Sequence, residues 1–205
     1  CGQTGNAFRG ASCSCGRTTR RTDGGLKVPV MRPPFQQEGL AELCRWANEQ
    51  GANNKAVEIG AYSGEGTEII AKYFKEVLAV DPWLNGYDIN DVASQQCPMK
   101  FVFDAFQART KPLGNVFFSR GKSLDALQFV NSESLDLVYV DGDHRYEAVV
   151  ADIQGWKPKL RKGGIMAGHD WSFTDVQNGL SETLGKADFK LFQGDSWAVI
   201  VDRKS

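Results

Sequence analysis

The segment AVEIGAYSGEGT, residues 56–67, decides the fold of this chain. It begins as a short apolar strand and runs into a turn that contains three glycines. An amphipathic helix follows, because Ile69, Ile70 and Phe74 recur at helical spacing. Glycines in such a turn let the backbone approach a ligand closely. The segment therefore predicts a strand, turn and helix that bind a ligand at the turn.

A second predicted strand ends in Asp81, about 20 residues beyond the glycine turn. An acidic side chain at this place in an α/β sheet can accept hydrogen bonds from the hydroxyls of a ribose. The dinucleotide fingerprint G-x-G-x-x-G does not fit the spacing of Gly60, Gly64 and Gly66, because Ile69 stands where the pattern needs a small residue. The sequence thus predicts a ribose-containing ligand and argues against a nicotinamide dinucleotide.

Short apolar strands alternate with helical segments along the rest of the chain, which predicts a doubly wound, mainly parallel sheet. Only Gly194, Asp195 and their neighbours separate the last two strands. A parallel crossover needs a dozen or more residues, so these two strands must form an antiparallel hairpin. The seven predicted strands are residues 56–60, 76–80, 115–119, 135–140, 164–168, 187–193 and 197–202.

The length and charge of the chain restrict its class. A chain of 205 residues suits one α/β domain and is too short for two full ones. Its 24 basic and 25 acidic residues give a net charge of −1, which favours a small-molecule substrate over nucleic acid or an anionic membrane. No apolar run reaches the roughly 20 residues of a membrane helix, and no secretory signal precedes the domain. We expect a cytoplasmic protein and leave a homo-oligomer open.

The beginning of the chain differs in composition from the rest. Residues 1–30 are rich in Gly, Ser, Thr and Arg and lack apolar periodicity, which predicts a flexible or poorly packed N-terminal extension. Residues 31–205 are predicted to form the single domain. Specificity is expected to depend on residues 27–35, residues 83–91 and the region after Asp170.

The glycine turn and Asp81 resemble the first motif of class I S-adenosylmethionine-dependent methyltransferases, in which an acidic residue precedes a glycine-rich turn. The predicted terminal hairpin is similar to the seven-stranded, Rossmann-like fold of that family. The resemblance implies that S-adenosyl-L-methionine is the cofactor, that Asp81 holds its ribose and that Ser123 contacts its adenine. It also implies that Glu58 organises the glycine turn or the methionine end. The implied cofactor-binding residues are Glu58, Gly60, Ala61, Tyr62, Ser63, Gly64, Gly66, Thr67, Asp81, Pro82, Trp83, Ser123 and Asp141.

Polar side chains follow two further strands of the predicted sheet. One apolar strand ends in Asp141, with His144 three residues later, and the next core strand is followed by His169 and Asp170. These are the only two histidines in the chain. Because ligands bind at the carboxyl ends of parallel strands, the four side chains are predicted to converge on one site.

The four residues resemble the site of the metal-dependent small-molecule O-methyltransferases, of the catechol type and of the macrolide and aminocoumarin sugar type. The resemblance implies a divalent metal, Mg²⁺ first, held by Asp141, His169 and Asp170. His169 stands where that group commonly has an acid, and imidazole suits Zn, Mn or Fe better, so the metal's identity stays open. The resemblance places the general base at His144, and a hydroxyl bound to a cation loses its proton readily to such a base. It implies metal-assisted O-methylation of a small hydroxylated molecule.

Several alternatives remain at this stage. Asp141 or Asp143, Asp170 and Ser123 are also suited to cap the helices that follow them. His144, His169 and Asp170 supply two imidazoles and a carboxylate, which keeps an iron-dependent oxygenase or hydroxylase open. A nicotinamide oxidoreductase, or a non-catalytic cofactor-binding domain, is compatible with the same fold class.

Overall fold

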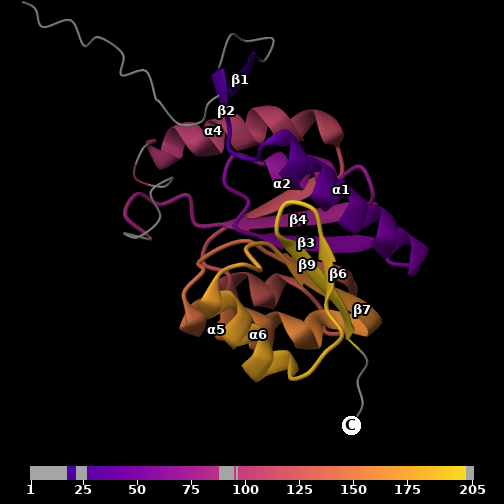
Figure 1. Cartoon of the computed structure of the whole chain (residues 1–205). Helices are drawn as coiled ribbons and strands as arrows, with labels where there is room; N and C mark the ends of the chain where they lie inside the picture. Colours follow the sequence, from indigo (N-terminus) through magenta and orange to yellow (C-terminus); the bar gives the residue numbers. More distant parts are fainter. Residues whose placement is uncertain (1–17, 22–26, 88–94, 96, 202–205) are drawn as a thin grey trace, which may run out of the picture.

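The computed structural model describes residues 18–21, 27–87, 95 and 97–201, in which helices cover both faces of a seven-stranded sheet (Figure 1). The strand order is β5-β4-β3-β6-β7-β9-β8. This order confirms the predicted Rossmann-like, doubly wound α/β fold. The strands are β3 Lys55–Ile59, β4 Glu76–Asp81, β5 Val116–Arg120, β6 Leu135–Val140, β7 Leu160–Gly168, β8 Lys190–Phe192 and β9 Ser196–Val201.

The strands β5, β4, β3, β6 and β7 pair in parallel, whereas β9 runs antiparallel to β7 and β8. The predicted C-terminal hairpin is therefore confirmed. Its turn contains Gly194 and Asp195, both with φ of 75°, and positive φ at consecutive residues matches the twist of tight hairpins. β7 begins at Leu160 rather than at residue 164, because Leu160 already pairs with Leu135 before an irregularity in the register.

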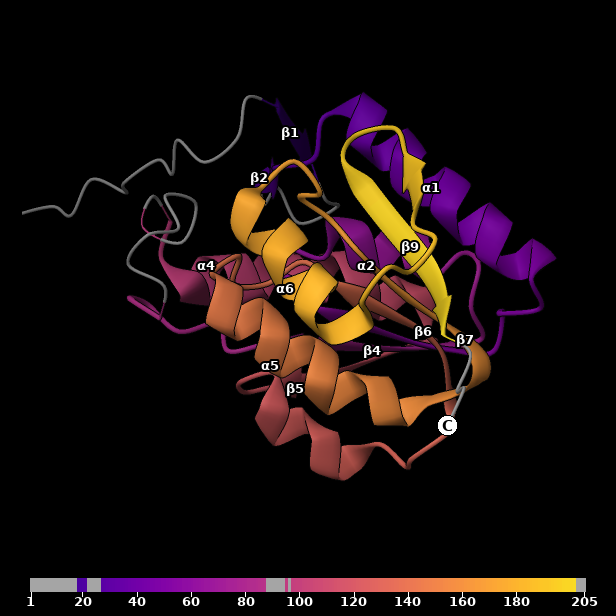
Figure 2. The ribbon, with the colours of Figure 1, turned by 60° about the horizontal axis from the view of Figure 1, so that its bottom comes forward.

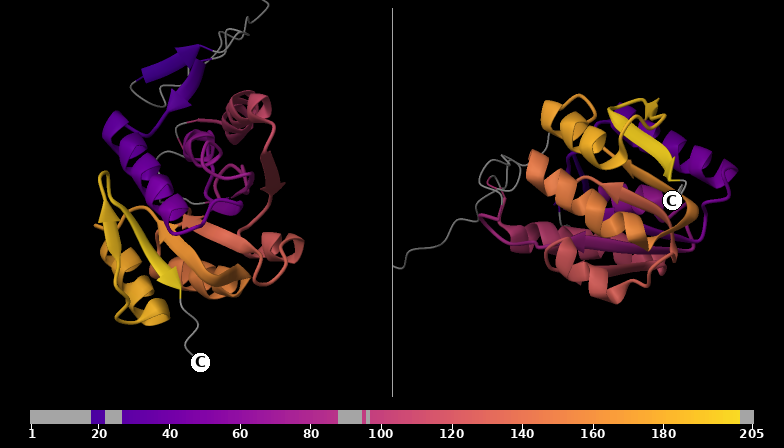
Figure 3. Two further views of the ribbon diagram at one scale, coloured as in Figure 1. Left: turned by 90° about the vertical axis from the view of Figure 1, so that its right-hand side faces the viewer. Right: turned by 90° about the horizontal axis from the view of Figure 1, so that it is seen from below.

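The central strand β6 is buried along its whole length, and its side chains alternate between two cores. Leu137 and Tyr139 pack with the helices α1 (Pro34–Glu49) and α2 (Glu65–Ile70). Val138 and Val140 pack with α5 (Tyr146–Trp156) and α6 (Thr174–Leu184) on the opposite face. Figures 2 and 3 show these two helical layers with the sheet between them.

The β5 end of the sheet is covered by α4 (Met99–Thr110). Trp83 packs there against Phe103 and Phe106, with ring centroids 4.8 and 4.7 Å apart. These aromatic contacts fix the loop that leaves β4. Short 3₁₀ helices complete the connections at η1 (Lys111–Leu113), η2 (Leu124–Phe129) and η3 (Lys157–Lys159).

Part of the predicted N-terminal extension has regular backbone structure. β1 (Thr18–Arg21) and β2 (Lys27–Val30) pair antiparallel in a separate two-stranded sheet, and β2 lies beside α4 (Figure 1). Residues 1–17 and 22–26 lie outside the described residues. The domain boundary after residue 30 stays a prediction. No helix in the described part of the chain is long and apolar enough to cross a membrane.

Candidate active site

A cavity of about 980 Å³ lies at the carboxyl ends of the parallel strands. This is the size of a site for a small molecule or cofactor. It is lined by residues from the glycine turn and from the ends of β4, β6 and β7, together with residues of α5 and η2. Of the predicted site residues, Glu58, Gly60, Ala61, Tyr62, Ser63, Gly66, Asp81, Pro82, Ser123, Asp141, His144, His169 and Asp170 line it.

Gly60 joins the ends of three strands at the floor of this cavity. Its N–H donates to Val80 O at 2.8 Å, and the N–H of Asp141 donates to Ile59 O at 2.8 Å. Gly60 has φ of 86°, and a Cβ at this position would overlap the backbone of Asp141. Only glycine combines this conformation with this contact. The turn therefore requires Gly60 for packing between strands as well as for an approach to a ligand.

Asp81 connects the glycine turn with the loop after β4. Its two carboxylate oxygens accept the backbone N–H of Tyr62 at 2.9 Å and of Trp83 at 2.7 Å. A carboxylate oxygen has two acceptor positions, so Asp81 can still receive hydroxyl donors from a ribose in the cavity.

Three predicted cofactor-binding residues, Gly64, Thr67 and Trp83, do not line the cavity. The Trp83 side chain is buried in the aromatic core, and its indole N–H donates to Tyr62 O at 2.7 Å. The large apolar ring of Trp83 explains this position. Packing beside α4 removes more of the ring's surface from water than a position at the rim of the cavity would remove. Trp83 thus supports the turn from behind.

Glu58 lies directly beneath the glycine turn and is 1% exposed. It accepts a hydrogen bond from the Thr67 hydroxyl, and a Cβ at Gly66 would overlap its carboxylate. Burial raises the pKa of Glu58 to about 8, although the Thr67 hydrogen bond and the charge of Arg32 oppose this shift. Glu58 therefore contacts the start of α2 at Gly66 and Thr67, and a role at the methionine end of a cofactor stays a prediction.

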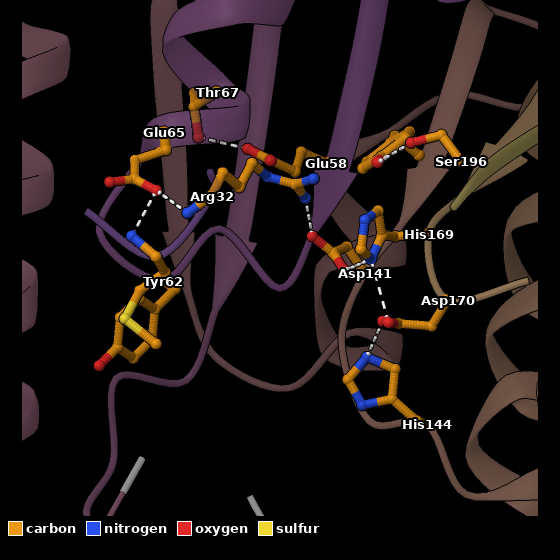
Figure 4. Close-up of polar contacts among 12 residues, drawn as sticks. Arg32, Glu58, Tyr62, Glu65, Thr67, Asp141, His144, His169, Asp170 and Ser196 are labelled. Carbon is orange, nitrogen blue, oxygen red and sulfur yellow. Dashed lines mark hydrogen bonds and ion pairs between the residues drawn. The ribbon is translucent and has the colours of Figure 1, made fainter. Parts of the chain in front are cut away.

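Arg32 enters the site from the segment before α1 and was not predicted as a site residue. Its guanidinium forms an ion pair with Asp141, and the residue is only 7% exposed (Figure 4). The backbone N–H groups of Met31 and Arg32 both donate to Glu65 Oε2, at 2.8 and 2.7 Å. Burial lowers the pKa of Arg32, but Asp141, Tyr139 and Glu58 together more than offset this, and the net pKa is raised. Arg32 is therefore a permanent positive charge inside the site.

The histidines and aspartates after β6 and β7 converge as predicted (Figure 4). His144 Nε2 lies 2.7 Å from Asp170 Oδ2, and His169 Nδ1 lies 3.1 Å from Asp170 Oδ1 and 3.8 Å from Asp141 Oδ1. Burial disfavours the ionised form of Asp170 and raises its pKa. The contacts with the two histidines outweigh burial and hold the pKa of Asp170 well below the usual range. Burial lowers the pKa of His169, and the two aspartates reverse this shift and raise it. The site favours charged Asp170 and protonated His169.

Helix capping does not explain the two acids. α5 and α6 begin after Arg145 and Phe173, and neither helix has a side-chain cap. The capping interpretation of Asp141 and Asp170 is therefore wrong. Asp143 does form a hydrogen bond with the local backbone, because it accepts the N–H of Arg145 at 3.0 Å.

The donor set suits a divalent cation. Ligand atoms of Asp141, His144 and Asp170 lie within 4.8 Å of one another. His169 is outside this group, although its Nδ1 faces both carboxylates. Two carboxylates with one or two imidazoles suit Mn, Fe or Zn as well as Mg²⁺. The chemistry of these residues thus fits a metal, while Arg32 already neutralises part of the charge of Asp141.

Residues 57–171, more than half of the chain, match the protein family described as "Methyltransferase domain". The chain belongs to this methyltransferase family, and its sheet is that of the class I S-adenosylmethionine-dependent enzymes. This membership favours methyl transfer over the oxidoreductase and oxygenase alternatives.

Solved structures with the same fold have low sequence identity. The O-methyltransferase NovP has 14% identity and a TM-score of 0.66, with 85% of this chain and 82% of that chain covered. An O-methyltransferase from Bacillus cereus in complex with SAH has 18% identity and a TM-score of 0.58, covering 85% and 84%. Cofactor-bound Rv0187 from MTB has 20% identity and a TM-score of 0.58, covering 86% and 84%. At such low sequence identities, the structural similarity establishes the fold alone.

One curated relative matches over a short segment. The uncharacterized protein y4gI of Sinorhizobium fredii (strain NBRC 101917 / NGR234) is 41% identical over 46 residues, which is 22% of this chain. The matched segment spans 5% of the length of that relative.

Replacement of Arg32 by Met should destabilise the fold by about 1.5–3 kcal/mol, because it leaves the partly buried Asp141 carboxylate without its charged partner. Urea unfolding measures the difference. The matched control is Arg45→Met, since Arg45 pairs with Glu38 at 2.8 Å on the surface, where such pairs contribute about 0–1 kcal/mol. Equal losses in the two variants would show that the Arg32 pair is no stronger than a surface pair.

Glu58 should make stability depend on pH. Its folded pKa of about 8 lies above the ordinary value of 4.5, so the native state binds the proton more tightly than the unfolded chain. The contribution of Glu58 protonation to the free energy of unfolding is complete below pH 4.5 and declines as pH rises toward 8. Urea unfolding at several pH values should show that Glu58→Gln reduces this decline. The same pH dependence in wild type and variant would contradict the assignment.

Proposed function

We propose that the protein transfers a methyl group from S-adenosyl-L-methionine to a hydroxyl oxygen of a small molecule, with His144 as the general base. The observation that carries this proposal is the contact of His144 with Asp170 inside the cavity that the glycine turn also lines. The family membership supports methyl transfer. The choice of oxygen as the acceptor rests on the imidazole and carboxylate pair, which suits removal of a hydroxyl proton.

The cofactor would lie along the glycine turn, where it would present its methyl group on a positively charged sulfur. Asp81 would accept hydrogen bonds from the ribose hydroxyls, and the backbone from Gly60 to Gly66 would follow the methionine end. Tyr62 N–H and Trp83 N–H already hold the Asp81 carboxylate in place. Because this carboxylate is already oriented, cofactor binding would lose less conformational entropy.

His144 would take the proton of the acceptor hydroxyl as its oxygen attacks the methyl carbon and the bond from carbon to sulfur breaks. His144 Nε2 lies 2.7 Å from Asp170 Oδ2, and a proton on Nε2 that faces this carboxylate would leave Nδ1 as the basic nitrogen. The Phe173 ring meets the His144 ring edge-on at 5.5 Å between centroids and restricts its rotation. Positioning and deprotonation supply the acceleration that this displacement needs.

A divalent cation would be held by Asp141 and Asp170, with His169 beside them. Its chemistry would be to lower the pKa of the acceptor hydroxyl. Arg32 occupies one side of the Asp141 carboxylate, so the opposite oxygen, toward His169, is the one suited to a metal. If His144 joined the ligands, it could not serve as the base, and we therefore assign the metal to the two carboxylates, beside His169.

Calorimetric titration with S-adenosylhomocysteine should show micromolar binding to the wild-type protein. Asp81→Asn should weaken this binding about tenfold to a hundredfold, because the amide replaces one acceptor oxygen with a donor nitrogen. The matched control is Asp104→Asn, which changes an exposed acid paired with Lys100 on α4. The folded wild type failing to bind would contradict the cofactor assignment.

The same titration, in chelator and then in Mg²⁺ or Mn²⁺, tests the metal. A separate heat or tighter S-adenosylhomocysteine binding is expected with the cation, and Asp170→Asn should remove this difference. Identical isotherms in all buffers would reject the metal and leave the assignment of His144 intact.

His144→Ala should lower kcat by about 10²- to 10⁴-fold, the usual contribution of a general base. The assay follows S-adenosylhomocysteine release with catechol and methyl glycosides as hydroxylated probes. Affinity for S-adenosylhomocysteine should stay unchanged in the variant. Tyr146→Phe is the control, because the Tyr146 hydroxyl contacts Glu182 on the surface. An unchanged kcat in His144→Ala would assign the base to another group.

A further inference from the structure

Every carboxylate oxygen of the candidate metal site already faces a nitrogen atom (Figure 4). Two imidazole nitrogens contact the oxygens of Asp170, from His144 at 2.7 Å and from His169 at 3.1 Å. The Arg32 guanidinium contacts Asp141 Oδ2, and the other oxygen of that carboxylate lies 3.8 Å from His169 Nδ1. A divalent cation at these oxygens therefore has to share them with the nitrogen atoms or displace those atoms.

The three nitrogen-bearing side chains differ in what they can do beside a cation. A neutral imidazole carries a lone pair, so His144 and His169 can each become an uncharged neighbour or a ligand of a metal. A guanidinium has only donors and is not deprotonated in proteins. Arg32 is thus the group of these three that can neither bind the cation nor lose its charge.

Both the backbone and the side chain of Arg32 are held in place. The N–H groups of Met31 and Arg32 donate to Glu65 Oε2 at 2.8 and 2.7 Å, and the Gln37 side-chain amide donates to Arg32 O at 2.8 Å. The guanidinium carbon lies 5.7 Å from the centroid of the buried Tyr139 ring. Moving the guanidinium away from its carboxylate partner would therefore break several contacts at once.

A positive charge fixed beside Asp141 opposes a second positive charge at the same carboxylate. Like charges at such short range repel strongly where the dielectric constant is low. The side chains of Arg32 and Asp141 are 9% and 17% exposed. Water therefore screens charges there less than it screens the surface pair of Arg45 and Glu38. The position of Arg32 thus disfavours a cation at Asp141.

We propose that Arg32 competes with a divalent cation for the Asp141 carboxylate and thereby sets the cation affinity of the site. This inference rests on the proposed cation site at Asp141 and Asp170. Coupling between two binding events is reciprocal, so a bound cation weakens the contact of Arg32 with Asp141 as much as that contact weakens cation binding. Met31 and Arg32 line the cavity, so the segment before α1 is held less tightly when the cation is bound.

Mn²⁺ titration of the chelator-treated full chain, followed by the electron paramagnetic resonance signal of free Mn²⁺, tests this inference. Arg32→Met should bind Mn²⁺ about 5- to 150-fold more tightly than wild type, the usual range for coupling between two sites. Arg32→Lys should stay close to wild type, because it keeps the positive charge. Adding Asp170→Asn to Arg32→Met should abolish the tighter binding. Arg45→Met is the matched control, since it removes an arginine from a surface ion pair and should leave Mn²⁺ affinity unchanged.

Thermal unfolding without cation establishes that each variant is folded. If Arg32→Met is not folded, Glu65→Gln replaces it, because the amide is a weaker acceptor for the backbone N–H of Arg32. Loss of the Glu65 charge alone would weaken cation binding, so tighter Mn²⁺ binding in this variant would support release of Arg32. Equal or weaker Mn²⁺ binding in the folded variant would overturn the inference.

The same titration separates this inference from the proposed methyl transfer. Mn²⁺ binding by Arg32→Met and not by wild type would support the competition in its strongest form. Absence of Mn²⁺ binding in wild type and in every variant would overturn the inference together with the cation site. S-adenosylhomocysteine binding to the same samples tests the cofactor independently of either result.

Discussion

The contact between Gly60 and the backbone of Asp141 is the constraint on which the site depends. It brings the end of β3 so close to the end of β6 that no side chain fits between them. The hydrogen bonds of Gly60 to Val80 and of Asp141 to Ile59 then fix β4, β3 and β6 in one register at the cavity floor. The acids at the ends of β4 and β6, Asp81 and Asp141, are consequently held at one edge by the sheet itself.

Charge balance makes the N-terminal segment part of this site. Glu58 is buried and Asp141 is partly exposed, and Arg32 is the cation that favours the ionised form of both carboxyl groups. The Glu65 carboxylate holds Arg32 by its backbone, so the first turn of α2 connects the glycine turn to the segment before α1. A change in that segment would therefore alter the acids of the site as well as access to it.

The sequence predicted the parts of this site that depend on local patterns. Strand periodicity, the glycine turn, Asp81 and the polar residues after β6 and β7 are each readable within about ten residues. Arg32 could not be found this way, because its position depends on Asp141, a partner over a hundred residues away in the chain. Trp83 shows the reverse case, since a loop aromatic gives no sign of whether it faces a ligand or the core.

The two ends of the cavity have opposite chemical characters, and this division bears on specificity. The end beside the glycine turn presents the Asp81 carboxylate, which the backbone N–H groups of Tyr62 and Trp83 hold in place. The other end places Arg32, His144 and His169 around two aspartates, so its charge can adapt to a metal or to a proton. Because the backbone of the glycine turn and of the loop after β4 fixes the first end, the second end, where side chains from three separate segments meet, is the part of the cavity that side-chain substitutions can alter most.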